Sequence, residues 1–142
     1  MKINVIPVSI EHMTEVVDIL QLISEFKPKN SCYEDIFIEF LEHPDNYGFV
    51  AVDDVQKVLG FGSILIEYKI RGGVMGHIED VAIHNQYQNR GIGKLIIEKL
   101  VEKGKNKNCY KISLSCKKKN INFYQKCHFI ESGLSMTKFI KY

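Results

Sequence analysis

A run of glycine and basic residues in the second half of the chain constrains the fold most. The run extends from Gln88 to Lys94, between an apolar segment that ends near Ile83 and an amphipathic segment that begins near Ile92. Glycine lets a ligand approach the backbone closely, and the free N–H groups of a helix's first turn attract anions such as pyrophosphate. The run therefore predicts a strand, an anion-binding loop and a helix in succession.

The loop matches neither common nucleotide fingerprint. Gly91 and Gly93 lack the third glycine of the dinucleotide motif because position 96 is Ile, and Gln88 stands where a P-loop would begin with glycine. A bare Gly-x-Gly is also a weak pattern, since glycine serves turns and close helix packing as well. The loop indicates a phosphate-bearing cofactor outside those two classes.

The rest of the chain divides into segments with helical or strand periodicity. Helices are expected over residues 10–24, 33–41, 92–103 and 120–127. Strands are expected before residue 10, over 48–52, 58–68, 76–83 and 110–116, and as one bent strand or two short strands over 129–140. Antiparallel strands followed by strand–helix–strand predict an α+β fold, with a mixed central sheet, helices on both faces and a right-handed crossover.

Composition excludes several classes of function. The 142 residues suit one domain, and 19 basic against 17 acidic residues give a formal charge of only +2, spread along the chain. A dedicated nucleic-acid binder is therefore not expected. No apolar run approaches the roughly 18 residues of a membrane span, and the N-terminus does not resemble a signal peptide. We expect a single domain over residues 1–142, in the cytoplasm, without nucleic-acid or membrane partners.

Metal and thiol chemistry also find little support in the sequence. The five histidines show no ligand spacing, so no metal is expected; they are His12, His43, His77, His84 and His128. The four cysteines lack a C-x-x-C pair and are expected to be structural thiols; they are Cys32, Cys109, Cys116 and Cys127. Cys127 adjoins His128, but sequence neighbours point in different directions on any regular element. A thiolate nucleophile is therefore not expected.

Two motifs resemble those of the GNAT acetyltransferase superfamily. The loop that follows Val-Ala-Ile is similar to its coenzyme A pyrophosphate loop, and a later Asn-x-x-Phe-Tyr run is similar to its second signature, at the expected distance. Segments 76–83 and 108–112 narrow the resemblance to the glucosamine-6-phosphate N-acetyltransferases. The resemblance implies the GNAT acyl-CoA N-acyltransferase fold, a homodimer, and acetyl transfer from acetyl-CoA to D-glucosamine 6-phosphate. The product would serve UDP-N-acetylglucosamine synthesis.

The resemblance also implies which residues hold acetyl-CoA. The backbone of Val81, Ala82 and Ile83 would hold the pantetheine arm. The pyrophosphate and sulfur ends would lie against Gln88, Asn89, Arg90, Gly91, Ile92, Gly93, Lys94, Asn120, Tyr124 and Lys126. Asn120 and Tyr124 are four residues apart, so both can face the sulfur from one side of a helix. Tyr124 would protonate the departing thiolate after direct attack by the amine, without a covalent enzyme intermediate.

The same resemblance assigns the acceptor site to Ser24, Glu79, Asp80, Tyr110, Lys111 and Ser115. Glu79 and Asp80 interrupt an apolar strand, and successive strand side chains point to opposite faces, so the two carboxylates are expected to have different surroundings. The alternative is a satisfied carboxylate at a sheet bulge. Lys111 offers a cation to a phosphate ester; the alternative is a solvated lysine at a strand end.

Two departures from the family affect the acceptor. Ser115 stands where the family has an acidic residue, and a neutral serine is no comparable base, so the amine is expected to lose its proton to water or to Glu79 through a water. The C-terminus lacks an expected arginine, for which Lys138 or Lys141 can substitute. Acetylation of another small amine or a protein amine, and a non-catalytic coenzyme A sensor, stay open as alternatives. Retention of both signature residues of the short helix argues against the sensor.

Overall fold

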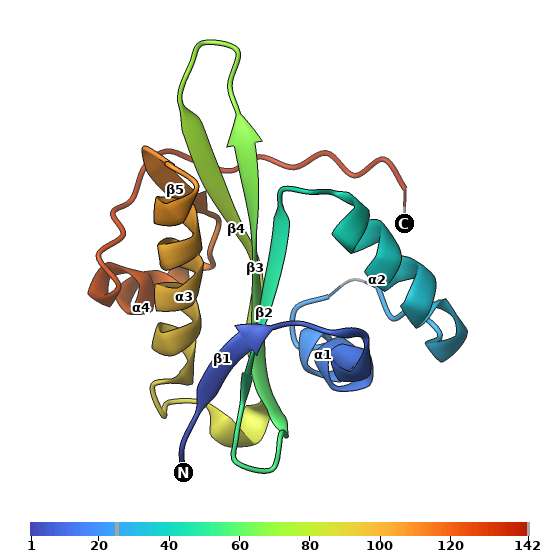
Figure 1. The fold of residues 1–142 in the computed structure, drawn as a ribbon. Coiled ribbons are helices and arrows are strands. Elements are labelled where there is room, and N and C mark those ends of the chain that lie inside the picture. The colour runs from blue at the N-terminus through green and yellow to red at the C-terminus, as the bar shows by residue number, and fades with distance from the viewer. Residues whose placement is uncertain (25, 142) are drawn as a thin grey trace.

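The computed structural model describes residues 1–24 and 26–141, which form a five-stranded sheet with helices on both faces (Figure 1). The strands are β1 (Asn4–Pro7), β2 (Asn46–Val52), β3 (Val58–Tyr68), β4 (Val74–Ile83) and β5 (Lys111–Leu114). The α-helices are α1 (Met13–Leu20), α2 (Tyr33–Glu42), α3 (Ile92–Asn106) and α4 (Ile121–Lys126). Short 3-10 turns are η1 (Ile10–His12), η2 (Asn30–Cys32), η3 (Asn85–Tyr87) and η4 (Lys118–Asn120).

Sheet order follows chain order, with β1 to β4 antiparallel and β5 parallel to β4. The helix α3 connects the two parallel strands, as the α+β prediction requires. One apolar cluster buries α3 against the sheet through Ile92, Ile96 and Leu100, four residues apart along one face. A second cluster buries Val16 and Ile19 of α1 on the opposite face. No helix in the described part of the chain is both long and apolar enough to cross a membrane.

Strand β4 has two irregularities that matter for function. Its residues 79–82 lie opposite residues 61–63 of β3, so β4 carries one extra residue, and Asp80 there has φ 55°. In addition, β4 pairs with β5 only through Met75 to Ile78, because β5 ends at Leu114 while β4 continues to Ile83. The two strands thus separate beyond Ile78, and the β5-facing backbone edge of β4 becomes available to an extended ligand.

The strand predicted over residues 129–140 is wrong. The structure describes this segment as extended chain outside the sheet, with Leu134 98% and Met136 95% exposed. Alternating apolar residues favour a strand only where a neighbouring edge supplies backbone partners. Figure 1 shows the segment crossing the molecule from α4 toward the side of α2 rather than lying along β5.

The first helix is also shorter than predicted. Regular α-helix ends at Leu20 instead of residue 24, and turns follow it. The Gln21 side chain donates hydrogen bonds to Val17 O at 3.2 Å and to Phe26 O at 3.1 Å. These two bonds turn the chain back toward the end of α1. The helix therefore stops at Leu20, although apolar residues continue at helical spacing beyond it.

Candidate active site

The predicted anion loop forms at the start of α3. Gly91 is the N-terminal capping residue and has φ 82°, and a Cβ added there would meet nothing within 4 Å, so the loop is open on that side. Gln88 Nε2 donates to Ile83 O at 3.3 Å and ties the loop to the end of β4. The Arg90 guanidinium lies 5.2 Å from the centre of the Tyr87 ring. Free N–H groups of the first helical turn and a nearby cation provide an anion site.

Gly93 joins this loop to α4. A Cβ at Gly93 would lie 3.1 Å from Phe123 Cζ and 3.3 Å from Phe123 Cε1, so a larger residue would push the Phe123 ring aside and glycine lets the two helices approach this closely. Asn120 ends η4 immediately before α4, and Lys126 ends α4; both side chains are exposed. The anion loop and the second motif therefore pack together, although they are about 30 residues apart in the sequence.

Tyr124 is half-buried in an aromatic cluster next to the end of β5. Its ring packs edge-on against Phe123 at 4.9 Å and Phe129 at 6.0 Å between centroids. Burial raises the pKa of Tyr124, and the nearby thiols of Cys116 and Cys127 raise it further. The phenol is thus protonated at neutral pH and can donate a proton to a basic leaving group.

The predicted pantetheine residues lie where β4 has separated from β5. Val81 and Ile83 pack toward α3 on one face of the sheet, and Ala82 packs toward α1 on the other. The backbone of these residues lies between the two layers and forms the edge of β4 that does not pair with β5. An extended chain of amide groups can add to such an edge as an extra strand would. The three residues lie on the part of β4 that does not pair with β5.

A cavity of about 560 Å³ opens on the other face of the sheet, between α1, α2, β3 and β4. Most of its wall is apolar, and its polar lining consists of Gln21, Ser24, Lys27, Ser63 and Asp80. Burial by the surrounding protein raises the pKa of the Asp80 carboxyl group. The Ser63 hydroxyl donates to Glu79 O at 3.1 Å, across the bulge. The bulge thus places the Asp80 carboxylate at the cavity. Asp80 belongs to β4, the same strand whose backbone edge is unpaired beyond Ile78.

The predicted acceptor residues do not all gather at this cavity. Ser24 and Asp80 line it, whereas Glu79, Ser115, Tyr110 and Lys111 do not. Glu79 and Ser115 are exposed, the second just beyond the end of β5. The two carboxylates have different surroundings, as expected, but a bulge and not regular alternation separates them.

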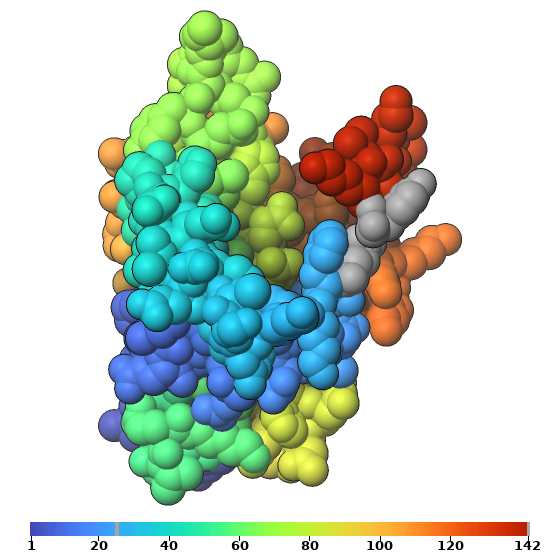
Figure 2. Space-filling view, turned by 90° about the vertical axis from the view of Figure 1, so that its right-hand side faces the viewer, coloured from blue at the N-terminus to red at the C-terminus, as the bar shows by residue number. Residues whose placement is uncertain are grey.

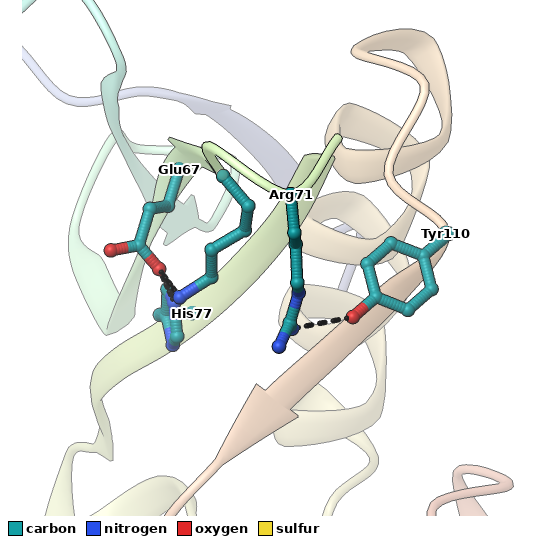
Figure 3. A network of polar contacts seen from close by, with 5 residues as sticks. Glu67, Arg71, His77 and Tyr110 are labelled. Carbon is teal, nitrogen blue, oxygen red and sulfur yellow. Dashed lines mark hydrogen bonds and ion pairs between the residues drawn. The ribbon is translucent and has the colours of Figure 1, made fainter. Parts of the chain in front are cut away.

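Tyr110 belongs instead to a cluster near the tip of the β3–β4 hairpin (Figure 3), and Lys111 follows it as the first residue of β5. Arg71 donates to the Tyr110 hydroxyl at 3.1 Å, and Lys111 Nζ lies 5.5 Å from the centre of the Tyr110 ring. Burial alone would raise the pKa of Tyr110, but Arg71 and Lys111 outweigh it and lower the pKa. In the same view His77 Nε2 contacts Glu67 Oε1 at 2.8 Å.

Sequence reasoning missed Lys27 and Arg71, because neither belongs to a motif. Lys27 lines the cavity, and Arg71 contacts a predicted acceptor residue. Within residues 1–24 and 26–141, no three His, Cys, Asp or Glu side chains converge as metal ligands.

The known proteins that this chain resembles belong to one family. The model of the acetyltransferase (GNAT) family matches residues 14–129. The chain is 35% identical over 125 residues to glucosamine 6-phosphate N-acetyltransferase 1 of Dictyostelium discoideum, covering 85% of this chain and 80% of that protein. It is 36% identical over 97 residues to glucosamine 6-phosphate N-acetyltransferase of Schizosaccharomyces pombe, covering 66% and 87%.

Solved structures support the same fold. Glucosamine-6-phosphate N-acetyltransferase from Arabidopsis thaliana superposes with a TM-score of 0.91 at 24% identity, over 99% of this chain and 100% of that one. A predicted acetyltransferase with acetyl-CoA from Clostridium acetobutylicum superposes with a TM-score of 0.74 at 19% identity, over 98% and 97%. At these identities the likeness establishes the fold.

Proposed function

Because the chain belongs to the GNAT acetyltransferase family, among relatives named glucosamine 6-phosphate N-acetyltransferases, we propose that it transfers acetyl from acetyl-CoA to D-glucosamine 6-phosphate. The observation that carries the proposal is the half-buried Tyr124 phenol, held against Phe123 and Phe129 on the helix that packs against the anion loop. A single domain over residues 1–142 would perform the reaction. The product, N-acetyl-D-glucosamine 6-phosphate, would enter UDP-N-acetylglucosamine synthesis.

The residues present suit acetyl-CoA. The free edge of β4 at Val81, Ala82 and Ile83 would bind the pantetheine amides, and the open face of Gly91 leaves room for a pyrophosphate at the first turn of α3. Gln88, Asn89, Arg90, Ile92, Gly93, Lys94, Asn120, Tyr124 and Lys126 would complete this site. When bound, acetyl-CoA supplies the activated thioester on which the chemistry depends.

In the proposed mechanism, the chain's own residues orient the amine, accept a proton from it and donate another proton to the sulfur. Asp80, at the cavity wall, attracts the incoming ammonium group. Glu79 accepts the amine proton through a water, since Ser115 offers no comparable base. Tyr124 donates its proton to the sulfur as the thioester bond breaks. The amine attacks directly, so no acyl-enzyme forms.

The test is coenzyme A release from acetyl-CoA by the purified protein. We expect turnover with glucosamine 6-phosphate and much weaker turnover with glucosamine or a lysine peptide. Exclusive turnover of another amine would refute the proposed acceptor while keeping the acetyl donor. Coenzyme A binding without turnover of any amine would favour a sensor instead.

We also propose a homodimer in the cytoplasm. Ile36 and Leu41 on α2, together with Leu134 and Met136 of the C-terminal segment, expose large apolar side chains. Large apolar side chains that stay exposed in one chain are typical of surfaces that contact another subunit. The proposed location agrees with the four free cysteines, since free thiols are the usual state of cysteine in a reducing compartment.

A further inference from the structure

We infer that Lys27 recognises the anionic group of the acceptor. The inference rests on the proposed function and identifies the side chain that would make the site prefer a phosphorylated amine. Lys27 follows α1 and lies in none of the motifs that indicate the acetyl donor site.

The cavity offers a charge of each sign. Its volume of about 560 Å³ lies within the range of small-ligand sites, roughly 300–1,000 Å³. Among the described residues that line it, Asp80 is the acidic one and Lys27 the basic one. They come from different walls, since Asp80 belongs to β4 and Lys27 to the segment between α1 and α2. A ligand with a cationic amine at one end and an anion at the other fits this arrangement.

The backbone around Lys27 is constrained from both sides. The Ser24 hydroxyl donates to Phe26 O at 2.6 Å and accepts from Phe26 N at 2.9 Å, and Gln21 also donates to Phe26 O. Pro28 follows Lys27 and restricts the backbone of the preceding residue to extended conformations. Ser24, expected to touch the acceptor, thus uses its hydroxyl to hold the backbone just before Lys27.

Other lysines are poorly placed for the same role. Lys111 lies over Tyr110 beside Arg71, near the hairpin tip, and does not line the cavity. Lys138 and Lys141 do not line the cavity of this chain either. Figure 2 shows the light-blue segment after α1 on the same face of the molecule as the olive-green β4, which carries Asp80. Lys27 is therefore the cation that the cavity itself provides.

The experiment compares Lys27→Ala with Lys29→Ala. Lys29 is an exposed lysine of the same segment that does not line the cavity. A cation bound to a phosphate contributes about 1.5–3 kcal/mol, so we expect Lys27→Ala to raise the KM for glucosamine 6-phosphate about 10- to 150-fold. Its kcat/KM for glucosamine and its Kd for acetyl-CoA, measured by calorimetry, should stay unchanged. Lys27→Arg should recover most of the affinity for the phosphorylated sugar.

The two proposals fail in different ways. A wild-type protein that does not prefer the phosphorylated sugar refutes the proposed function. A wild-type protein that prefers it, together with a Lys27→Ala variant whose KM equals that of Lys29→Ala, overturns only the role of Lys27. Calorimetric titration with glucosamine 6-phosphate and no acetyl donor gives a second readout, in which Lys27→Ala should lose binding and Lys29→Ala should keep it.

Discussion

Among single residues, Tyr124 has the most direct chemical role in the proposed mechanism. Replacement of its hydroxyl in Tyr124→Phe removes the proton donor and leaves the ring against Phe123 and Phe129. Because general acid catalysis contributes about 10²–10⁴-fold, we expect kcat to fall about a hundredfold or more, with KM for acetyl-CoA little changed. Steady-state kinetics measures both. Tyr47→Phe, on β2 beneath Lys103, is the matched control and should keep wild-type kcat.

The pH dependence of kcat tests the same residue. Burial disfavours the phenolate, so the pKa of Tyr124 lies above the ordinary value of about 10 and the donor stays protonated throughout the neutral range. The wild-type profile should therefore show no loss of rate from tyrosine ionisation below about pH 10. A Tyr124→Phe variant with wild-type kcat would exclude the residue as proton donor.

Among the secondary-structure elements, the contact between α3 and α4 joins the proposed pyrophosphate loop to the helix of the proposed proton donor. Gly93→Val would place a branched side chain where even a Cβ lies 3.1 Å from Phe123. Overpacking of this kind costs about 1–3 kcal/mol, so thermal unfolding should occur at lower temperature and kcat should fall as Tyr124 moves with Phe123. The double variant with Phe123→Leu frees space and should recover part of the stability. Wild-type melting of Gly93→Val would contradict this packing.

The sequence predicts the elements that depend on neighbouring residues in the chain. It does not predict features that depend on contacts with distant parts of the chain. The helix after Gly91 and the strand before it follow from glycine placement and apolar spacing. The sequence leaves the bulge at Asp80 open as an alternative, because aspartate is enriched at positive φ but most aspartates do not adopt it. Lys27 reaches the site through tertiary structure alone. The apolar alternation over 129–140 predicts a strand that the structure does not contain, because a strand also needs an edge to pair with.

At the scale of the whole molecule, the exposed C-terminal segment determines the expected assembly. Charges at Leu134 and Met136 would oppose burial in an interface, so Leu134→Asp with Met136→Asp should convert the dimer into a monomer in analytical ultracentrifugation. Val55→Asp is the control, since Val55 is 82% exposed in the β2–β3 turn, away from α2 and the C-terminal segment. A monomeric wild-type protein would refute the proposed dimer.

The proposed acceptor cavity and the anion loop are encoded in separate stretches of the chain. Most of the cavity wall comes from residues before 41, whereas the loop, the free edge and Tyr124 lie between 81 and 124. They meet only at the bulged strand β4. Evolution can therefore remodel the first third of the gene to accept a different amine while the apparatus for the acyl donor is inherited intact. In protein engineering, the same separation makes residues 8–40 the natural target for a library that retains acetyl-CoA as its reagent.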